Sequence, residues 1–585
     1  MKIGLAISHD SSAAITTDKG EIISALGEER ISRIKNHVGI PMNSIKLLTR
    51  NLDLSELNEC IIGTNKNLTL LGARQIVFNL SDNPSNPTGK WLPQAPGQNN
   101  NFQLLGNSPY EIVENKLKIE FPEIFGKIKF TWENHHDSHL GCALGMSNHS
   151  RRLIISLDNA GDGESGAVGV TESGNFNSLY RINSLDSLGA MYTAVTEKYN
   201  FRPGSHEGKI TGLAALGAYS EAVEILSKHV LVKNGRIKIV HCHKLKDIII
   251  GKVASKFGIR LKTKMQLNEI IDLAESKTNN YPDLAFAIQE VLEKSVLELT
   301  RHWVLETGIP DVSLAGGVFA NVKLNQRISE SDFARDIQIF PNMGDGGIAV
   351  GGVWSQLAKR GLLSSTNLFS DMYLAPNTDA LDDSEILKME LDPSLKIEVI
   401  ALDNLPKVIA ESINVGSIVA FHSGNMEFGP RALGNRSLLI DPRRGDLVSI
   451  VNKRLKRTEF MPFAPMVMQD KFDEYFIKSS QQTITPFLYM TMTCNVKQQY
   501  RTKIPAVTHT DGTARPQAVS EQSNKIVYKI LSEFSKLSGL HLVVNTSLNI
   551  HEEPINFSLK DSIKALKLDA FDVLYFKNMK ITLSK

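Results

Sequence analysis

Short apolar, β-prone runs separated by polar turns predict three consecutive strands at the start of the chain. These predicted strands are Lys2–Ile7, Ala13–Thr17 and Glu21–Leu26. The same plan recurs later, where the predicted strands are Arg152–Leu157, Gly166–Thr171 and Phe176–Ile182. The chain therefore contains two similar sets of strands.

An aspartate lies just beyond the first strand of each set, Asp10 in the first and Asp158 in the second. A repeat on this scale predicts two related α/β halves that face a shared cleft. Two sets of hairpins can also resemble each other by chance. The matched aspartates favour the repeat.

Helical spacing of apolar residues follows the second set and predicts an amphipathic helix over Tyr281–Leu305. The polar stretch 364–396 is interpreted as a connection between domains. The pattern then begins again with a predicted strand at Ile397–Leu402 and a helix at Leu405–Asn414. A second domain is therefore predicted over roughly 390–585.

Length and composition narrow the class of protein. A chain of 585 residues is too long for one hydrophobic core, so two or three domains are expected. A net charge of +2 gives no reason to expect a partner bound by charge, such as nucleic acid or a membrane. The four cysteines are scattered, and no apolar run reaches the roughly 18–20 residues that span a bilayer. We expect a soluble, cytoplasmic protein.

Two histidines and two carboxylates are the candidate ligands of a metal ion. In a helix, His135 and His139 would project from one face about 6 Å apart. Asp158 and the glycine-flanked Asp345 follow predicted strands and complete a 2-His-2-carboxylate set, which suits Fe(II), Mn(II) or Zn(II). Two histidines alone are more often structural or surface residues. The rival cluster at 241–243 lacks both the helical spacing and companion carboxylates.

Glycine-rich turns after β-prone runs are candidates for nucleotide binding. Glycine lets backbone N–H groups approach phosphate, and the dipole of a following helix adds to the attraction. Each turn alone could be only a tight turn, but three in one domain favour a nucleotide. The predicted nucleotide-binding residues are Gly161, Asp162, Gly163, Lys209, Gly316, Gly317 and Asn321.

Arginines and small polar residues in the C-terminal region predict a site for a small oxyanion. The segment EFGPRALGNRS carries two arginines that can clamp an anion, and a basic run follows it. The basic run alone would be read as a solvated helix face. The candidate anion-binding residues are Arg431, Arg436, Lys456, Arg457, Arg515, Asn545 and Ser547.

Taken together, these motifs resemble those of the NodU/CmcH family of O-carbamoyltransferases. The motifs that carry the resemblance occur in the family's order and span nearly the whole chain: HDSSAA, EERISRIK, HHxxH, LDNAGDGE, GKITGLA, LAGGVFAN, GDGGIAVG, EFGPRALGNRS, HTDGTARPQ and NTSLNIHEEP. The resemblance implies an α/β fold with a duplicated, actin-like (ASKHA) N-terminal domain at 1–365. It also implies a connection at 366–390 and an α+β, YrdC-like C-terminal domain at 391–585.

The resemblance implies a two-stage reaction. Carbamoyl phosphate and ATP would form carbamoyl-adenylate in the YrdC-like domain, with Mg²⁺ accompanying the nucleotide. The actin-like domain would then pass the carbamoyl group to an acceptor hydroxyl. By the same resemblance His135, His139, Asp158 and Asp345 hold the metal, and iron is the ion implied. The C-terminal cations would bind carbamoyl phosphate.

Transfer to a hydroxyl needs a base near the carbonyl carbon. His9, in the first turn beside Asp10, is the candidate general base. The alternative is a turn histidine that only bonds the backbone. The two interpretations are about equally supported by the sequence.

Two positions depart from the family pattern. Met461 stands where many members have arginine before Pro-Phe-Ala-Pro, and the basic run before it is spaced differently. His551 and Glu552 stand where members commonly read Arg-Gly in Asn-x-Arg-Gly-Glu-Pro. Each change removes a guanidinium from the predicted anion site. A neighbouring cation such as Arg457 would have to substitute, or donor binding would be weaker.

Two other functions remain open at this stage. One is a tRNA threonylcarbamoylation-type enzyme, against which the near-neutral charge argues. The other is an actin-like ATP-binding module without transfer activity. For the leading interpretation the acceptor is a small molecule with a hydroxyl: a natural product, a sugar, or a hydroxymethylated nucleoside or nucleotide. We expect its contacts to come from loops at 65–110; the sequence does not decide whether the protein forms a homodimer.

Overall fold

The computed structural model describes residues 1–7, 9–63, 109–147, 150–240, 261–364, 368–376, 383–456 and 463–584. Several predictions fall outside these ranges. They concern the acceptor loops up to 108, the cluster at 241–243, and the side chains of Arg457 and Met461. Within the described residues, no helix is both long and apolar enough to cross a bilayer.

The first sheet follows the predicted hairpin plan. Its described strands are β1 (Lys2–Ala6), β2 (Ser12–Thr16), β3 (Ile22–Gly27), β4 (Glu59–Ile62) and β5 (Lys129–Trp132). Their order is β3-β2-β1-β4-β5, with antiparallel pairs on one side of β1 and parallel pairs on the other. Each predicted strand of the first set starts and ends within one residue of the observed one.

The second sheet has the same topology. Its described strands are β6 (Leu153–Gly161), β7 (Glu164–Glu172), β8 (Asn175–Asn183), β11 (Asp311–Ala315) and β12 (Asp336–Ile339). Their order is β12-β11-β6-β7-β8, again antiparallel on one side of the first strand and parallel on the other. The repeat predicted from the sequence is therefore confirmed as two α/β halves of one topology.

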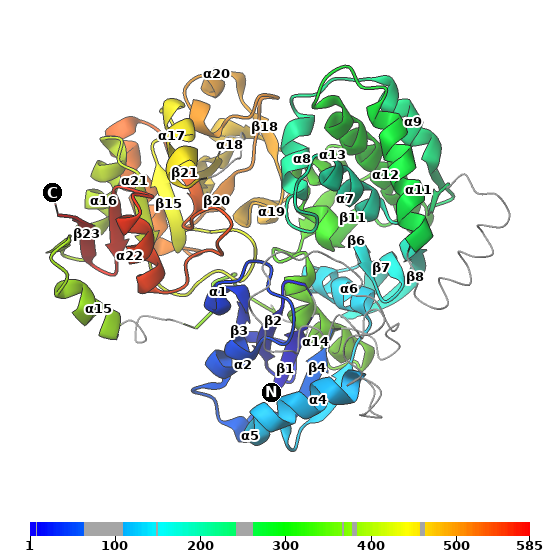
Figure 1. The fold of residues 1–585 in the computed structure, drawn as a ribbon, viewed down its shortest axis with the longest axis horizontal. Helices are drawn as coiled ribbons and strands as arrows, with labels where there is room; N and C mark the ends of the chain where they lie inside the picture. The colour runs from blue at the N-terminus through cyan, green and yellow to red at the C-terminus, as the bar shows by residue number, and fades with distance from the viewer. Residues whose placement is uncertain are drawn as a thin grey trace, which may run out of the picture.

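Two helices pack closely against each other between the sheets, α6 (His135–Gly145) and α14 (Ile348–Lys359) (Figure 1). A Cβ atom on Gly141 of α6 would lie 2.0 Å from the carbonyl oxygen of Gly351, and a Cβ on Gly351 would lie 2.0 Å from that of Ser138. Only glycine permits this approach. α6 packs on β6 and α14 packs on β1, so the helix pair joins the two halves.

Further helices cover each half. In the first half they are α1 (Glu29–Ser32), α2 (Met42–Thr49), α4 (Pro109–Glu120) and α5 (Pro122–Phe125). In the second half they are α7 (Leu188–Lys198), α8 (Glu207–Ala214), α9 (Glu221–His229), α11 (Leu261–Glu275), α12 (Asp283–Thr307) and α13 (Val322–Ser329), with the hairpin β9 (Val230–Lys233) and β10 (Arg236–Ile239). The helix predicted at Tyr281–Leu305 is α12, which ends at the left-handed Gly308 (φ 68).

The C-terminal unit is built on a mixed sheet whose order among the described strands is β13-β23-β22-β14-β15-β21-β16-β20. These strands are β13 (Leu395–Val399), β14 (Val419–His422), β15 (Arg436–Ile440), β16 (Ala464–Met468), β20 (Gln517–Val519), β21 (Leu542–Ser547), β22 (Val573–Phe576) and β23 (Met579–Leu583). A smaller sheet holds β17 (Phe476–Ile477), β18 (Cys494–Val496) and β19 (Thr513–Ala514). Helix α16 (Leu405–Asn414) has the predicted bounds.

The remaining C-terminal helices are α15 (Asp383–Glu390), α17 (Asp446–Arg454), α18 (Phe472–Tyr475), α19 (Thr485–Leu488), α20 (Gln498–Arg501), α21 (Lys525–Ser538) and α22 (Leu559–Lys567). The segment before α15 touches the first sheet, because the backbone N–H groups of Ile22 and Ala25 in β3 donate to the carbonyl oxygens of Leu368 and Leu374. This part of the predicted connection therefore lies against the N-terminal domain. α15 packs against α22 and β13 and lies with the C-terminal unit.

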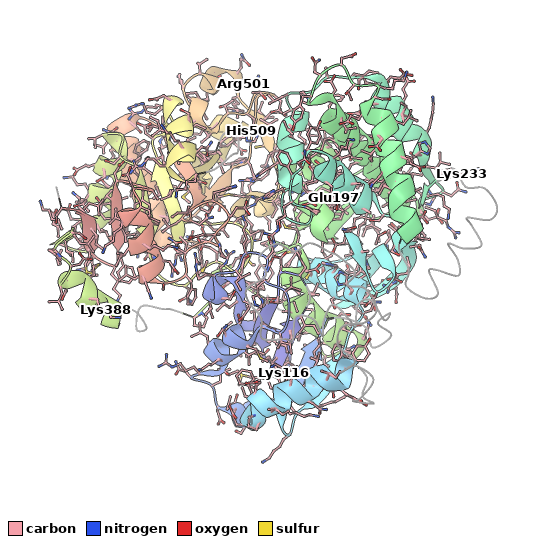
Figure 2. All side chains as sticks on the ribbon, in the orientation of Figure 1. Lys116, Glu197, Lys233, Lys388, Arg501 and His509 are labelled. Carbon is pink, nitrogen blue, oxygen red and sulfur yellow. The ribbon has the colours of Figure 1, made fainter. Side chains whose placement is uncertain are left out.

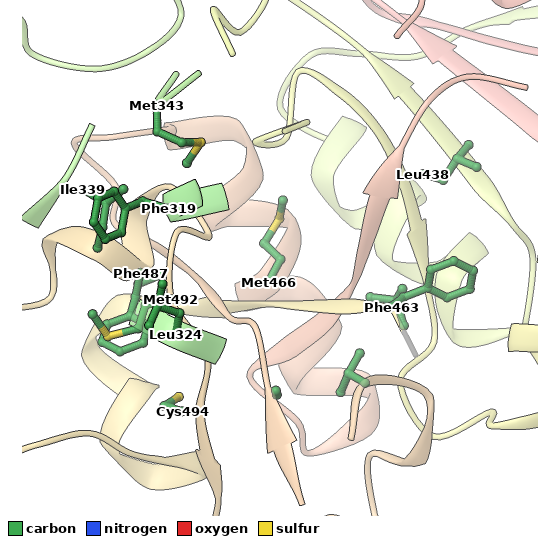
Figure 3. Packing of buried hydrophobic residues seen from close by; sticks show 14 of the residues in the cluster. Phe319, Leu324, Ile339, Met343, Leu438, Phe463, Met466, Phe487, Met492 and Cys494 are labelled. Carbon is green, nitrogen blue, oxygen red and sulfur yellow. The ribbon is translucent and has the colours of Figure 1, made fainter. Parts of the chain in front are cut away.

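The C-terminal unit and the second N-terminal half share one hydrophobic core. Figure 3 shows Phe319, Leu324 and Ile339 of the second half beside Phe487 and Met492 of the C-terminal unit, and all five are buried in one cluster. Burial of large apolar side chains across a boundary stabilises a fixed contact. The two units are therefore packed together through a common core.

Candidate functional site

The N-terminus of α6 is held by two side chains. Asn134 is the N-cap residue, and its Oδ1 atom accepts a hydrogen bond of 3.0 Å from the N–H of Asp137. The Oδ2 atom of Asp162 accepts a hydrogen bond of 2.9 Å from the N–H of His135. The first turn of α6 is thereby tied to the β6–β7 hairpin. This fixes the direction in which His135 and His139 project.

The four predicted metal ligands converge. The Nε2 atoms of His135 and His139 lie 3.2 Å apart. The Oδ2 atom of Asp158 lies 3.4 Å and 3.2 Å from them, and Oδ1 of Asp345 lies 3.6 Å from each. Candidate ligand atoms of all four residues lie within 4.8 Å of one another. The helix α6, the strand β6 of the second sheet and the short helix η5 (Asp345–Gly347), which leads into α14, contribute them.

These residues fit a divalent cation. Both imidazoles are buried, and each presents Nε2 to the same two carboxylates. Burial lowers the pKa of His135, but the carboxylates of Asp345 and Asp158 outweigh it and raise the pKa to about 9. The pocket thus attracts positive charge. Two nitrogen and two oxygen donors suit Fe(II), Mn(II) or Zn(II), so metal binding remains the prediction for this cluster.

Three of the glycines predicted to bind a nucleotide pack directly around this cluster. A Cβ atom on Gly161 would lie 2.1 Å from the His135 ring, and one on Gly317 would lie 2.8 Å from Oδ1 of Asp158. Gly316 has φ 97, and a Cβ there would lie 2.2 Å from the Leu157 carbonyl oxygen. These glycines are required by the geometry of the carboxylate and histidine ligands. Nucleotide contact is a separate prediction for them.

The other predicted nucleotide residues have structural contacts of their own. Asp162 caps α6, as described above, and Lys209 in α8 places Nζ 5.3 Å from the centre of the Phe201 ring. The side chain of Asn321 caps α13 and donates a hydrogen bond of 2.8 Å to Gln289. Gly163 is not packed as closely as the other three glycines, because a Cβ there would meet no described atom within 4 Å. Nucleotide binding at these positions stays a prediction.

His9 and Asp10 form an ion pair at the edge of this centre. Nδ1 of His9 lies 2.8 Å from Oδ2 of Asp10, and Asp10 adopts a left-handed backbone (φ 55). Burial lowers the pKa of His9, but Asp10 outweighs it and raises the pKa to about 9. His9 therefore carries a proton at neutral pH in this state. It can act as a general base only after losing that proton.

The predicted anion-binding loop of the C-terminal unit is organised around a buried carboxylate. Oε1 of Glu427 accepts hydrogen bonds from the N–H groups of Leu433 (2.7 Å), Asn435 (2.9 Å) and Arg436 (3.3 Å). The Nη1 atom of Arg436, which is fully buried, donates to three backbone carbonyls at 2.8 to 3.2 Å. At least this part of the guanidinium holds the loop together.

Asn545 connects this loop to the sheet. Its Nδ2 atom donates to the carbonyl oxygen of Ala432 at 2.9 Å and to Oε1 of Gln517 at 2.8 Å. Ser547 and Ser437 are paired residues of β21 and β15. The structure therefore brings Arg436, Asn545 and Ser547 together beside the loop that carries Arg431.

Other predicted anion residues lie on neighbouring segments. Lys456 follows α17, and Arg515 follows β19. The backbone of His551 lies beside Leu455, because its backbone N–H donates to the Leu455 carbonyl oxygen at 2.9 Å. His509, in the motif that contains Arg515, lies on the side of the C-terminal unit that faces the second half (Figure 2). Across that boundary, Lys323 donates a hydrogen bond of 2.8 Å to Asp511.

Sequence reasoning gave no role to several residues that position these sites. Glu427 and Gln517 stand inside the quoted motifs, and their buried hydrogen bonds hold the loop. Asp137 differs, because its place between the two candidate histidine ligands suggested a role in orienting a ligand ring; in the structure it contacts both Lys359 and Arg181. The available signal for Glu427 was a single carboxylate in a motif whose other charged residues are arginines.

Comparison with known proteins identifies the class of this enzyme as a transferase of carbamoyl groups. Residues 1–354 match the family described as carbamoyltransferase N-terminus, and residues 410–582 match carbamoyltransferase C-terminus. The chain therefore belongs to the carbamoyltransferase family.

Two relatives match this chain over nearly its whole length. The chain is 30% identical over 590 residues to an uncharacterized protein of Methanocaldococcus jannaschii, covering 100% of this chain and 99% of the relative. It is 29% identical to nodulation protein NolNO of Sinorhizobium fredii, covering 95% of this chain and 76% of that protein. Among solved structures, HypF of T. kodakarensis has a TM-score of 0.35 at 12% identity, covering 63% of this chain and 48% of that one.

Proposed function

We propose that the protein is an ATP-dependent O-carbamoyltransferase. It would convert carbamoyl phosphate and ATP to carbamoyl-adenylate and pass the carbamoyl group to a hydroxyl of a small molecule. The observation that carries this proposal is the convergence of two histidines and two aspartates between the N-terminal halves. A second, arginine-bearing loop in the C-terminal unit supplies a chemically different site. Two sites of different chemistry suit two half-reactions.

The first half-reaction is assigned to the C-terminal unit. Carbamoyl phosphate and water yield carbamate and phosphate, and carbamate displaces pyrophosphate from ATP. Arg431, Lys456 and Arg515 would bind the phosphate, on which negative charge grows as the C–O bond breaks. Arg436 holds the loop from which Arg431 projects. Fixed cations in a preorganised loop stabilise such charge better than mobile ones.

The second half-reaction is assigned to the N-terminal halves. The acceptor oxygen attacks the carbamoyl carbon, AMP leaves, and the hydroxyl proton passes to His9 once that side chain is neutral. Asp10 orients the His9 ring through the contact at Nδ1. A divalent ion held by His135, His139, Asp158 and Asp345 would act as a Lewis acid toward the carbonyl or the adenylate phosphate. A natural product, a sugar, or a hydroxymethylated nucleoside or nucleotide would serve as acceptor.

The test needs no acceptor. Purified protein is incubated with ATP, Mg²⁺ and carbamoyl phosphate, and pyrophosphate release and carbamoyl-adenylate are followed by mass spectrometry. Pyrophosphate release that requires carbamoyl phosphate would support the donor half. Absence of release from metal-loaded protein, with and without a panel of hydroxylated acceptors, would contradict the proposal.

Arg431→Ala should suppress carbamoyl-phosphate-dependent pyrophosphate release at least tenfold, because loss of one charge-assisted contact to an anion costs about 1.5–3 kcal/mol. Arg444→Ala is the matched control, since Arg444 is exposed and pairs with Asp446 away from the loop. It should release pyrophosphate at the normal rate. Equal rates for the two variants would count against the anion site.

A further inference from the structure

Glu552 occupies a strained backbone position. Its φ is 63, in the left-handed region that residues with a side chain rarely adopt. Such positions persist where the surrounding contacts over-determine them. Contacts of the Glu552 side chain are therefore expected to offset the backbone strain.

The carboxylate of Glu552 bridges the two parts of the enzyme. Its Oε1 atom lies 2.9 Å from Nε2 of His206, at the N-cap position of α8 in the N-terminal domain. The same atom lies 3.1 Å from Nε2 of His551 in the C-terminal unit. Burial raises the pKa of Glu552, but the hydrogen bond with His206 and the charge of Lys35 outweigh it and lower the pKa. The carboxylate is thus ionised at neutral pH.

A chain of short polar contacts continues from His206 to the candidate base. The neighbouring Ser205 donates through Oγ to Oδ1 of Asn36 at 2.6 Å. Nδ2 of Asn36 donates to Oδ1 of Asp10 at 2.7 Å, and Oδ2 of Asp10 contacts His9. Asn36 donates to a carboxylate and accepts from a hydroxyl, which fixes the orientation of its amide. A movement of His206 therefore reaches the Asp10–His9 pair through two hydrogen bonds.

The other end of the bridge lies at the predicted donor site. His551 is tied by its N–H to Leu455, the residue before Lys456. Glu552 consequently contacts His551, next to the predicted carbamoyl phosphate site. It also contacts His206, which is linked to the predicted transfer site.

A second contact between the two parts of the enzyme also holds this segment in place. Arg33 donates to the carbonyl oxygens of Ile555 and Pro554, each at 2.8 Å, and so already anchors the segment to the N-terminal domain. An anchor that duplicates Arg33 would not explain a strained glutamate. A contact that responds to occupancy of the donor site would explain it.

We propose that Glu552 is a positioning residue that couples occupancy of the donor site to the orientation of the Asp10–His9 pair. The proposal rests on the function proposed above. The bridge from His551 through Glu552 to His206 would transmit a shift of the donor-binding segment to Ser205, Asn36 and Asp10. The Asp10–His9 pair would then be oriented for transfer only when the donor site is occupied.

Hydrogen–deuterium exchange on the full chain tests this coupling. Exchange is measured over residues 33–37 and 203–207, with and without saturating carbamoyl phosphate, ATP and Mg²⁺. The wild-type protein should show a ligand-dependent change in both segments. Glu552→Gly removes the bridge and relieves the strain, so it should lose the change while keeping its stability and its pyrophosphate release. Glu533→Gln is the control, because Glu533 pairs with Lys536 within α21, outside the bridge, and it should keep the change.

The outcomes separate this inference from the proposed function. A ligand-dependent change that persists in Glu552→Gly, or that never appears in a wild-type protein that releases pyrophosphate, would overturn the coupling alone. A wild-type protein that neither releases pyrophosphate nor responds to carbamoyl phosphate would overturn both. Loss of the change in Glu552→Gly alone, with unfolding and pyrophosphate release unaffected, would support it.

Discussion

At the scale of single residues, the chemistry of the N-terminal site depends on where buried nitrogen atoms point. His139 is fully buried, and its Nε2 faces His135, Asp158 and Asp345. Burial lowers its pKa, but the hydrogen bonds with the two aspartates outweigh it and raise the pKa. A buried imidazole between two carboxylates holds a cation, either a proton or a metal ion.

Replacement of His139 by alanine should remove bound metal, because three ligands then remain from a four-ligand set. We expect the metal content per chain to fall by at least tenfold, as measured by elemental analysis after exhaustive dialysis, since loss of even a supporting partner typically costs about 10–100-fold in affinity. His229→Ala is the control, because His229 at the end of α9 contacts the Val240 backbone at 2.8 Å and lies outside the cluster. Metal retained by His139→Ala would contradict the ligand assignment.

Metal affinity should rise with pH between about 6.5 and about 9. The pKa of His135 is raised to about 9, so below that pH the metal-free protein holds a proton that the metal must displace. One displaced proton lowers the apparent dissociation constant about tenfold per pH unit. Chelator-competition titrations at several pH values within this window measure the slope. A dissociation constant independent of pH would show that no proton is displaced.

At the scale of elements, the site depends on the crossing of α6 and α14. These helices approach so closely at Gly141 and Gly351 that each backbone fills the space of the other's side chain. α6 carries both histidines, and η5, which carries Asp345, leads directly into α14. The helix crossing therefore sets the distance between the histidines and Asp345.

Gly141→Ala should destabilise the protein by about 1–3 kcal/mol, because the new Cβ overlaps the Gly351 carbonyl and forces the helices apart. Separated helices should also weaken metal binding. Urea denaturation and metal titration measure the two effects. Gly208→Ala in α8 is the matched control, since a Cβ there meets no described atom within 4 Å, and it should not destabilise the protein.

At the scale of the whole molecule, the C-terminal unit and the second half form one core. The cluster continues from Phe319 and Leu324 to Phe487 and Met492 (Figure 3), and a buried hydrogen bond of 2.7 Å from Asn325 to the Thr491 carbonyl oxygen crosses the same boundary. Polar contacts such as Lys323 with Asp511 and Arg33 with Pro554 also join the C-terminal unit to the N-terminal halves. We expect the two units to unfold together.

Phe487→Ala tests this expectation. All four tryptophans lie in the N-terminal domain, at 91, 132, 303 and 354, so their fluorescence reports that domain alone. Loss of the buried ring should cost about 3–5 kcal/mol and shift the tryptophan transition in urea to lower concentration. Ile477→Ala, at a position that is 52% exposed in the same unit, should leave it unchanged. An unshifted transition in Phe487→Ala would mean that the units unfold independently.

Much of the local structure could be predicted from the sequence. The strands of both hairpin sets and helix α16 lie where local patterns predict them, because these elements depend on short-range periodicity and turns. Roles of individual polar residues were harder to predict. Asn321 and Asp162 suit a nucleotide as residue types, yet each caps a helix. Whether a side chain bonds the backbone or a ligand depends on its neighbours in space.

By itself the sequence determined the repeat, the positions of the strands of both hairpin sets and of helices α12 and α16, and the identities of the four candidate metal ligands. Periodicity and motif order can be recognised in the sequence without knowledge of how the chain packs. Only the tertiary structure decided that Asp158 and Asp345 meet the histidines, that His9 is protonated by its pair with Asp10, and that Glu552 reaches His206. The contacts of Asp158, Asp345 and Glu552 join residues far apart in the chain, and helix crossing and the packing of the two units set their distances. His9 and Asp10 are neighbours in the chain, but the pKa of His9 depends on burial, which the fold sets.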